Sequence, residues 1–333
     1  MITIKIPPQL TSLNVIKFNL SLKDYRDAKG YRFDFSELRF AKPFAMLFLA
    51  QSIHEFVKIN NSTATCEALI NETPSKNSPC SYLAHMGFFT DVGIKYGKQT
   101  GEASGGENYI PITEIVFEEL SQDKIYTCPH ELLEKKAKEL ANVLVQSDRN
   151  DAYEIMGYCI RETLRNAMEH SGADSVRICG QYWPKSQIAQ IAILDTGKGF
   201  LESLKENALH QSLTDDEKAL ELALLPATSG KKIMKHYNHN GWGNSGFGLY
   251  MLKNICKDSG SLLISTNKVA LQIDNKQTTW GHAGLRGASL KVEIDLKKLK
   301  ELGTLEENLK RYRDKSNVAT KPSSSSMTFI RGR

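Results

Sequence analysis

The sequence predicts an α/β protein made of two domains. Its C-terminal half holds a long helical stretch, then a buried strand, then a glycine-rich loop that runs into a second helix. Its N-terminal third shows a separate alternation of strand and helix patterns. A chain of 333 residues with 41% hydrophobic side chains is long enough to bury two cores.

Four segments make up the N-terminal pattern. Residues 33–40 alternate in polarity as a strand does, and residues 43–60 have the spacing of an amphipathic helix that starts at a proline. Residues 63–70 suggest another strand, and residues 80–89 suggest a helix that ends near a glycine. We therefore expect a small α/β domain over residues 1–123.

The helix predicted over residues 152–170 carries three polar side chains spaced four apart, namely Glu162, Asn166 and His170. They form a stripe on one face and can point at one ligand. The amide of Asn166 can give one oxygen to a Mg²⁺ ion that is otherwise held by phosphates and waters. One turn earlier, Glu162 can take a proton from a water or hydroxyl that attacks a phosphate. A solvent-facing amphipathic helix would show the same stripe.

A buried strand over residues 188–194 ends at Asp195, and the chain then turns through Gly197 and Gly199. A carboxylate fixed there can accept a hydrogen bond from the exocyclic amine of adenine. Guanine has an oxygen at that place and would leave a buried Asp unpaired, so we expect ATP over GTP. The glycines let the backbone turn sharply and approach the base. Asp-x-Gly also fits a simple hairpin turn.

The third segment is a glycine run at residues 241–248 that leads into an apolar-periodic helix at 249–256. Unpaired amides at a helix start suit phosphates, although a glycine run alone also fits a flexible linker. The residues of this segment that we predict to contact nucleotide are Gly243, Gly246, Phe247, Gly248 and Leu249.

In this order, the three segments resemble the nucleotide pocket of the GHKL ATPase superfamily, which includes gyrase B, Hsp90, MutL and histidine kinases. Residues 162–171 look closest to the anti-sigma-factor serine kinases. The resemblance covers about residues 126–299 and implies a Bergerat-type α/β sandwich, with helices on one face of a mixed sheet. It implies ATP and Mg²⁺ as cofactors, Glu162 as the catalytic residue and Asn166 as the metal ligand.

The resemblance also assigns the stretches around the third segment. Residues 200–242 match the position of the family's ATP lid, where a cationic cluster can reach phosphates or simply face solvent. This cluster is Lys231, Lys232, Lys235 and His236. Residues 261–266 and 287–294 look like two strands, and in the second Ser289 stands where the family often has a phosphate-facing threonine.

The N-terminal succession resembles a STAS domain, the partner fold of the anti-sigma kinases. Regulatory STAS domains carry Asp-Ser-Ser/Thr-Gly after the first strand, whereas this chain has Lys-Pro-Phe-Ala at residues 42–45. The phosphorylatable hydroxyl is therefore absent. We expect a docking or sensing role for residues 1–123, and a purely structural, dimer-forming domain is the alternative.

Composition narrows the class of partner and compartment. The 43 basic and 38 acidic residues leave a formal charge of +5, too mild to argue for a nucleic-acid partner. The six cysteines lack Cys-x-x-Cys spacing, which suits free thiols in the cytoplasm. The longest apolar stretch, residues 44–50, is too short to span a bilayer, so no membrane association is expected.

Two further stretches complete the division of the chain. A connecting helix is expected over residues 124–145, at the start of an ATPase domain that covers residues 124–300. The C-terminal region, residues 301–333, is expected to contain most of a charged helix and then a disordered serine-rich tail. The helix is expected to begin one residue earlier, at residue 300.

The leading hypothesis is an ATP-dependent switch. Mg-ATP closes the lid over Glu162, Asn166 and Asp195, the N-terminal domain passes the change to a protein partner, and slow hydrolysis resets the ATPase. One alternative is a serine/threonine protein kinase acting in trans, and another is an ATP-binding module without turnover. The short interval between His130 and Asn166 argues against a histidine kinase, and the resemblance allows a homodimer.

Overall fold

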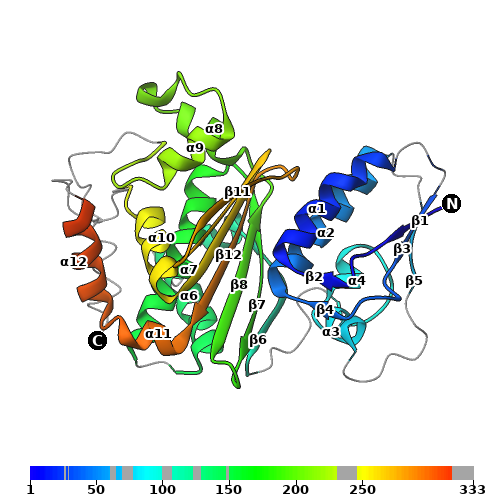
Figure 1. Cartoon of the computed structure of the whole chain (residues 1–333), viewed down its shortest axis with the longest axis horizontal. Coiled ribbons are helices and arrows are strands. Elements are labelled where there is room, and N and C mark those ends of the chain that lie inside the picture. Colours follow the sequence, from blue (N-terminus) through cyan, green and yellow to red (C-terminus); the bar gives the residue numbers. More distant parts are fainter. Residues whose placement is uncertain are drawn as a thin grey trace.

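The computed structural model describes residues 1–25, 28, 30–60, 65–69, 78–99, 107–122, 129–147, 150–230 and 246–316. They form an α/β fold in layers (Figure 1). A seven-stranded sheet has one set of helices on each face, and a small parallel sheet lies beyond the N-terminal helices.

The large sheet has the strand order β11-β10-β9-β12-β8-β7-β6. Every neighbouring pair in it is antiparallel, which corrects the expectation of a mixed sheet. Short turns connect β7 to β8, β9 to β10 and β10 to β11, and such turns can join only antiparallel neighbours. The strands are β6 (Tyr109–Val116), β7 (Ser175–Trp183), β8 (Ile188–Asp195), β9 (Gly260–Thr266), β10 (Val269–Asp274), β11 (Thr278–His282) and β12 (Ala288–Asp295).

Helices α6, α7 and α10 cover one face of this sheet and bury the first hydrophobic core against it. The predicted helices over residues 152–170 and 249–256 are confirmed as α7 and α10. The charged stretch from residue 300 onward was predicted as one helix, but it is split between α11 and α12 because Gly303 has a φ of 81°. The bounds are α6 (Pro129–Val145), α7 (Asp151–His170), α10 (Gly248–Ser259), α11 (Leu296–Glu301) and α12 (Leu305–Ser316).

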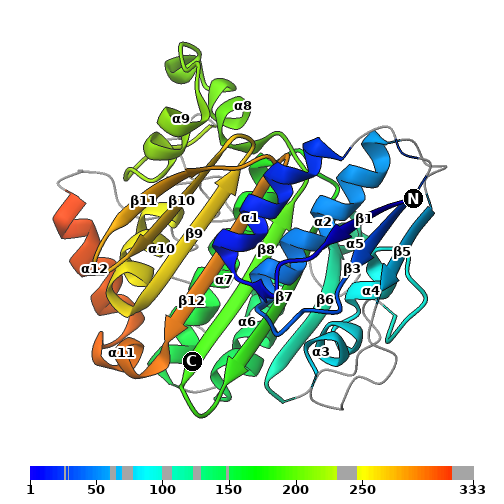
Figure 2. The same ribbon diagram turned by 45° about the vertical axis from the view of Figure 1, so that its right-hand side comes forward.

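The N-terminal segment covers the other face (Figure 2). Helices α1 (Ser12–Ser21) and α2 (Pro43–Ile59) lie between the large sheet and a parallel sheet of β1 (Ile2–Lys5), β3 (Gly30–Asp34) and β5 (Thr65–Leu69). The expected strand over residues 33–40 is shorter, because a turn follows Asp34, whose side chain accepts the amide of Ser36 at 2.9 Å. The chain then forms β4 (Phe40–Ala41), which pairs with β2 (Gln9–Leu10). The helix expected over residues 80–89 forms as α3 (Pro79–His85) and α4 (Phe88–Asp91).

The N-terminal segment shares its hydrophobic core with the large sheet. The core side chains of α1 and α2 pack with Leu194, Leu263 and others on the sheet. Polar contacts reinforce this packing: Gln190 Oε1 accepts the amide of Phe44 at 3.0 Å, and Lys42 Nζ donates to Glu293 Oε2 at 2.8 Å. Strand β6 precedes the expected domain boundary at residue 123, yet it is an edge strand of the large sheet.

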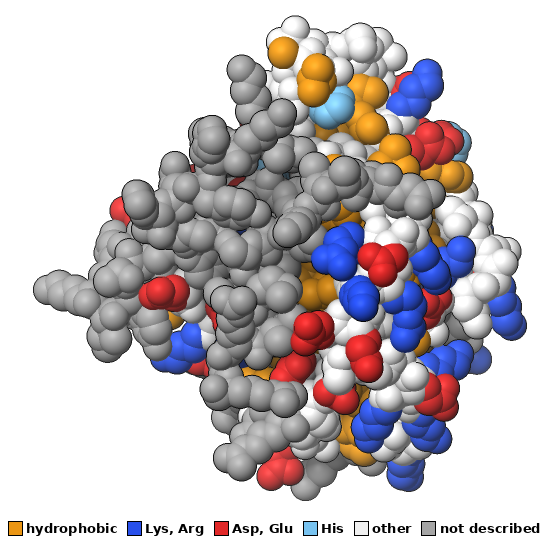
Figure 3. All heavy atoms as spheres, turned by 90° about the vertical axis from the view of Figure 1, so that its left-hand side faces the viewer, with side chains coloured by type: hydrophobic (Ala, Val, Ile, Leu, Met, Phe, Trp, Pro, Cys, Tyr) orange, Lys and Arg blue, Asp and Glu red, His pale blue; other side chains and the backbone are white. Residues whose placement is uncertain are grey.

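Three smaller helices complete the described part of the chain, and none of its helices is long and apolar enough to cross a membrane. Helix α5 (Phe117–Gln122) follows β6. Helices α8 (Gly199–Lys205) and α9 (Asp216–Ala223) project beyond the end of the sheet at which β8 finishes (Figure 1). Basic and acidic side chains intermingle where they are visible in Figure 3, which agrees with the mild net charge.

Candidate functional site

A cavity opens between α7, the ends of β8 and β12, and the start of α10. The empty space in it, including the open solvent at its mouth, is about 920 Å³. Of the residues singled out in the sequence, the ones that line it are Glu162, Asn166, His170, Asp195, Gly199, Gly246, Gly248 and Leu249. The fold therefore brings parts of all three predicted segments together in one place.

Glu162 is held between a buried cation and a helix start. The residue is only 5% exposed, and its Oε1 accepts a hydrogen bond from Arg161 Nη2 at 2.7 Å. The Arg161 guanidinium is itself buried and lies 5.3 Å from the centre of the Tyr158 ring. The second oxygen, Oε2, lies so close to Gly248 that a Cβ there would overlap it. This carboxylate oxygen therefore faces the first turn of α10, where a negative charge is favoured.

Asn166 lies one turn further along α7, on the cavity wall. Its amide Nδ2 is shielded from solvent and has no hydrogen-bond partner among the described residues. The described residues also contain no cluster of three metal-binding side chains. The buried Nδ2 can therefore donate to an acceptor atom of a ligand, and Oδ1 of the same amide is the atom that would coordinate a Mg²⁺ ion.

Asp195 ends β8 and is 6% exposed. Burial raises the pKa of its carboxyl group to about 6, and hydrogen bonds from the backbone amides of Gly197 and Ala288 act in the opposite direction. The bond from Gly197 N to Oδ1 is 3.0 Å long. A buried carboxylate with amide donors on one side can accept a further hydrogen bond from a ligand.

The loop after Asp195 is joined to the C-terminal end of α7. Lys198 N donates to the carbonyl of Ser171 at 2.9 Å, and a Cβ on Gly197 would overlap that same carbonyl. Ser171 follows Glu162 by nine residues, which is about 13 Å along a helix. The cavity therefore has an Asp195 end and a Glu162 end, a layout that suits an elongated ligand.

Two predicted contacts, Ser289 and Phe247, do not line the cavity. Ser289 is 2% exposed, and its neighbours Ala288 and Leu290 line the cavity, so strand alternation directs Ser289 to the opposite face of the sheet. The structure therefore does not place Ser289 among the lining residues of the cavity, where the phosphate contact was expected. Phe247 is buried in the core against the Tyr250 ring, with the ring centroids 6.2 Å apart, and does not line the cavity.

The remaining predicted residues divide into two groups. Gly197 supports the site through its hydrogen bond to Asp195, although it does not line the cavity. Gly243 and the cationic cluster of the predicted lid, Lys231, Lys232, Lys235 and His236, lie outside the described residues.

The sequence reasoning missed several lining residues. Arg165 lies on α7 and donates from Nε to Glu169 Oε1 at 2.7 Å; its position three residues after Glu162 could have identified it. Most of the others come from the connection between β8 and α10, whose residues 200–242 were expected to form the ATP lid, but without these contacts being named. They are Phe200, Ser203, Leu204, Ala223, Thr228, Ser229 and Gly230.

Comparisons with protein-family models, with curated proteins and with solved structures find no match to this chain. The assignment to the GHKL superfamily, with its STAS-like N-terminal part, therefore stays a prediction that rests on the motifs and on the cavity they line.

Proposed function

We propose that the chain is a Mg-ATP-binding ATPase of the GHKL type with a Bergerat-type sandwich, and that its nucleotide state controls a protein partner. One observation carries the proposal. Glu162, Asn166 and Asp195 line a single cavity, together with the first residue of α10, although they come from three separate segments of the chain.

The Asp195 end suits an adenine base. Its carboxylate accepts the Gly197 amide and can also accept from the exocyclic amine of adenine. Guanine presents a carbonyl oxygen there, so its binding would leave a buried carboxylate facing another acceptor. The proposal therefore includes a preference for ATP over GTP.

The Glu162 end suits the phosphates. The amides of the first turn of α10 are donors for an anion, and the absence of a side chain at Gly248 lets Glu162 Oε2 lie against this turn. Asn166 would hold a Mg²⁺ ion beside the phosphates, and the bound ion would neutralise part of their charge. Arg165 adds a buried cation to the same wall.

Hydrolysis would use Glu162 as the general base. Arg161 fixes Oε1 and leaves Oε2 toward the cavity side of α10. Oε2 takes a proton from a water whose oxygen attacks the γ-phosphorus, and the bond between that phosphorus and the bridging oxygen of ADP breaks. The products are ADP and inorganic phosphate.

The test follows the γ-phosphate of labelled ATP with Mg²⁺ in the wild-type chain and in Glu162→Gln, with nucleotide binding measured in both. Glu169→Gln is the matched control, because Glu169 is on the same helix, pairs with Arg165 and does not line the cavity. We expect phosphate release by the wild type and by Glu169→Gln, and loss of release with retained binding in Glu162→Gln.

Two results would change the assignment. If the wild-type chain does not bind ATP, the proposed function is wrong. If it binds ATP and neither the wild type nor the control releases phosphate, the ATPase step is wrong. The label then distinguishes transfer to a protein acceptor, as in a kinase, from binding without turnover.

A further inference from the structure

Asn267 joins three segments at the Asp195 end of the cavity. It lies in the tight turn between β9 and β10 with a φ of 45°. Its Nδ2 donates to the carbonyl of Lys198 at 3.3 Å and to Asp216 Oδ1 at 3.2 Å. Its Oδ1 accepts the amide of Gly287 at 3.2 Å. One side chain thus forms hydrogen bonds to three segments that are separate in the sequence.

Two of these stretches shape the cavity directly. Lys198 belongs to the loop that follows Asp195, and the neighbouring Thr266 Oγ1 accepts the amide of Phe200 at 3.3 Å. The β9–β10 turn therefore holds both the end of this loop and the start of α8. Asp216 is the first residue of α9, whose Ala223 lines the cavity.

The third stretch, residues 283–287, connects the cavity to the N-terminal helices. At one end, Gly287 lies directly against the carbonyl of Asp195. At the other end, Leu285 is buried in the core shared with α1 and α2, and a Cβ on Gly284 would lie 2.9 Å from Asn19 Oδ1 of α1. Burial raises the pKa of the Glu55 carboxyl group on α2, and Gln51 and the Arg286 backbone and guanidinium act in the opposite direction, so residue 286 lies near this carboxyl group.

The connection is short. Figure 2 shows the turn between β11 and β12 beside the end of α1. Five consecutive residues thus extend from the N-terminal helices to Asp195, and Asn267 is bonded to the last of them. A ligand that moves or stiffens the Asp195 loop would act on a contiguous path made of the Asn267 hydrogen bonds and the packing of residues 283–287.

We propose that Asn267 is a positioning residue for the adenine end, and that residues 283–287 carry the effect of nucleotide binding to α1 and α2. This inference rests on the proposed function, since it assumes that ATP is the ligand. It also says how the effect would reach the N-terminal helices. The loop after Asp195, which would contact the base, is joined through Asn267 to residues 283–287, and these residues pack on α1 and α2.

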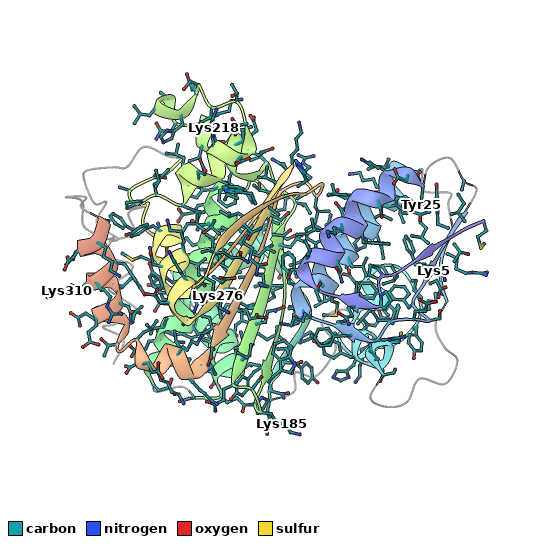
Figure 4. All side chains as sticks on the ribbon, viewed as in Figure 1. Lys5, Tyr25, Lys185, Lys218, Lys276 and Lys310 are labelled. Carbon is teal, nitrogen blue, oxygen red and sulfur yellow. The ribbon has the colours of Figure 1, made fainter. Side chains whose placement is uncertain are left out.

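The test compares Asn267→Gly with Gln187→Gly. Both residues have positive φ in tight β-turns of the same sheet, at 45° and 55°, so glycine keeps the backbone conformation and removes only the side chain. Gln187 lies between β7 and β8, near Lys185, at the end of the molecule opposite to Lys218 of α9 (Figure 4). Its side chain is far from the Asp195 loop.

The measurements are the affinities for Mg-ATP and Mg-GTP, and amide hydrogen exchange in α1 and α2 with and without saturating Mg-ATP. Loss of the three hydrogen bonds in Asn267→Gly should weaken ATP binding about ten-fold and narrow the preference for ATP over GTP. The change in amide hydrogen exchange that ATP causes in α1 and α2 should be smaller in this variant than in the wild type. Gln187→Gly should match the wild type in all three readouts.

The outcomes separate this inference from the proposed function. If the wild type binds no ATP, both are wrong. If it binds ATP and Asn267→Gly keeps the wild-type affinity, selectivity and exchange response, only the inference is overturned. If Asn267→Gly does not fold, Asn267→Asp decides the matter, because it keeps the acceptor for Gly287 and loses both donor bonds. Wild-type selectivity and exchange response in Asn267→Asp would then overturn the inference.

Discussion

Replacing Asp195 by Asn should stabilise the protein at neutral pH and, in the same variant, weaken ATP binding. The folded state holds this carboxyl group in a buried site, where its pKa is raised from 3.8 to about 6. The unfolded chain keeps the ordinary value, so the folded state binds the proton more tightly. The tighter binding of this proton stabilises the folded state fully below about pH 4, and this stabilisation is lost as the pH rises through 6.

The magnitude follows from the size of the shift. One pKa unit corresponds to about 1.4 kcal/mol, so a rise from 3.8 to about 6 corresponds to about 3 kcal/mol at neutral pH. The residue is only 6% exposed, so solvent screening reduces this value little. An Asn side chain carries no charge and can still accept the amide of Gly197. The advantage of Asp195→Asn over the wild type should therefore grow between about pH 4 and pH 6 and level off above it.

The assay is urea unfolding without nucleotide at about pH 4.5 and about pH 7.5, with the two proteins compared at each pH so that other carboxyl groups cancel. Asp215→Asn is the control, since Asp215 is exposed and caps α9 by accepting the amide of Lys218 at 2.8 Å, a role that Asn also fills. It should show no pH-dependent gain. An Asp195→Asn protein whose stability relative to wild type does not change between the two pH values would refute the reasoning.

Three further outcomes are expected at the same site. ATP affinity should fall as the pH drops below about 6, because protonation of Asp195 removes the charge that strengthens its bond from the adenine amine and adds an O–H donor beside that amine. Calorimetry at two pH values measures this. Gly248→Ala should abolish phosphate release, because the new Cβ would overlap Glu162 Oε2; unchanged turnover would contradict the close approach of α10. Asn166→Ala should bind ATP with an affinity that no longer rises on addition of Mg²⁺, whereas the wild-type affinity should rise. A titration of Mg²⁺ against fluorescent nucleotide compares the two proteins.

The stability gain and the loss of binding belong together physically. A buried charge that costs folding free energy is retained where a ligand uses it, so a variant that is more stable and less able to bind marks a functional position. Arg161 and Glu162 form a second buried charged group in the cavity wall. Removal of the Glu162 carboxylate leaves the buried charge of Arg161 uncompensated. Glu162→Gln is preferred to Glu162→Ala for the hydrolysis test because its amide oxygen can still accept from Arg161 and its side chain fills the same space.

Local patterns allowed the site-forming elements to be predicted. The helix over residues 152–170 and the strand over residues 188–194 agree with α7 and β8 to within one residue at each end. Hydrophobic spacing and the absence of proline act within one segment, so they are readable without knowledge of the rest of the chain. The same is true of the stripe formed by Glu162, Asn166 and His170, all of which line the cavity.

The tertiary structure decided the features that depend on long-range pairing. The all-antiparallel order of the sheet, the position of Ser289 on the face away from the cavity and the approach of Gly248 to Glu162 arise from contacts between segments far apart in sequence. The register between β8 and β12, for example, sets Ala288 opposite Asp195 and so turns Ser289 away. The alternation of apolar and polar residues in β12 groups Ser289 with Lys291 and Glu293, away from Leu290, but only the pairing with β8 shows which of the two faces meets the cavity.

The sequence by itself therefore determined which side chains are available for nucleotide chemistry and on which local elements they lie. Only the tertiary structure decided that they share one cavity, that Arg161 bonds Glu162, and that Asn267 joins the loop after Asp195 to Gly287. The physical reason is the range of the interactions. Backbone periodicity is a property of neighbouring residues, whereas burial, charge pairing and strand register depend on the whole fold.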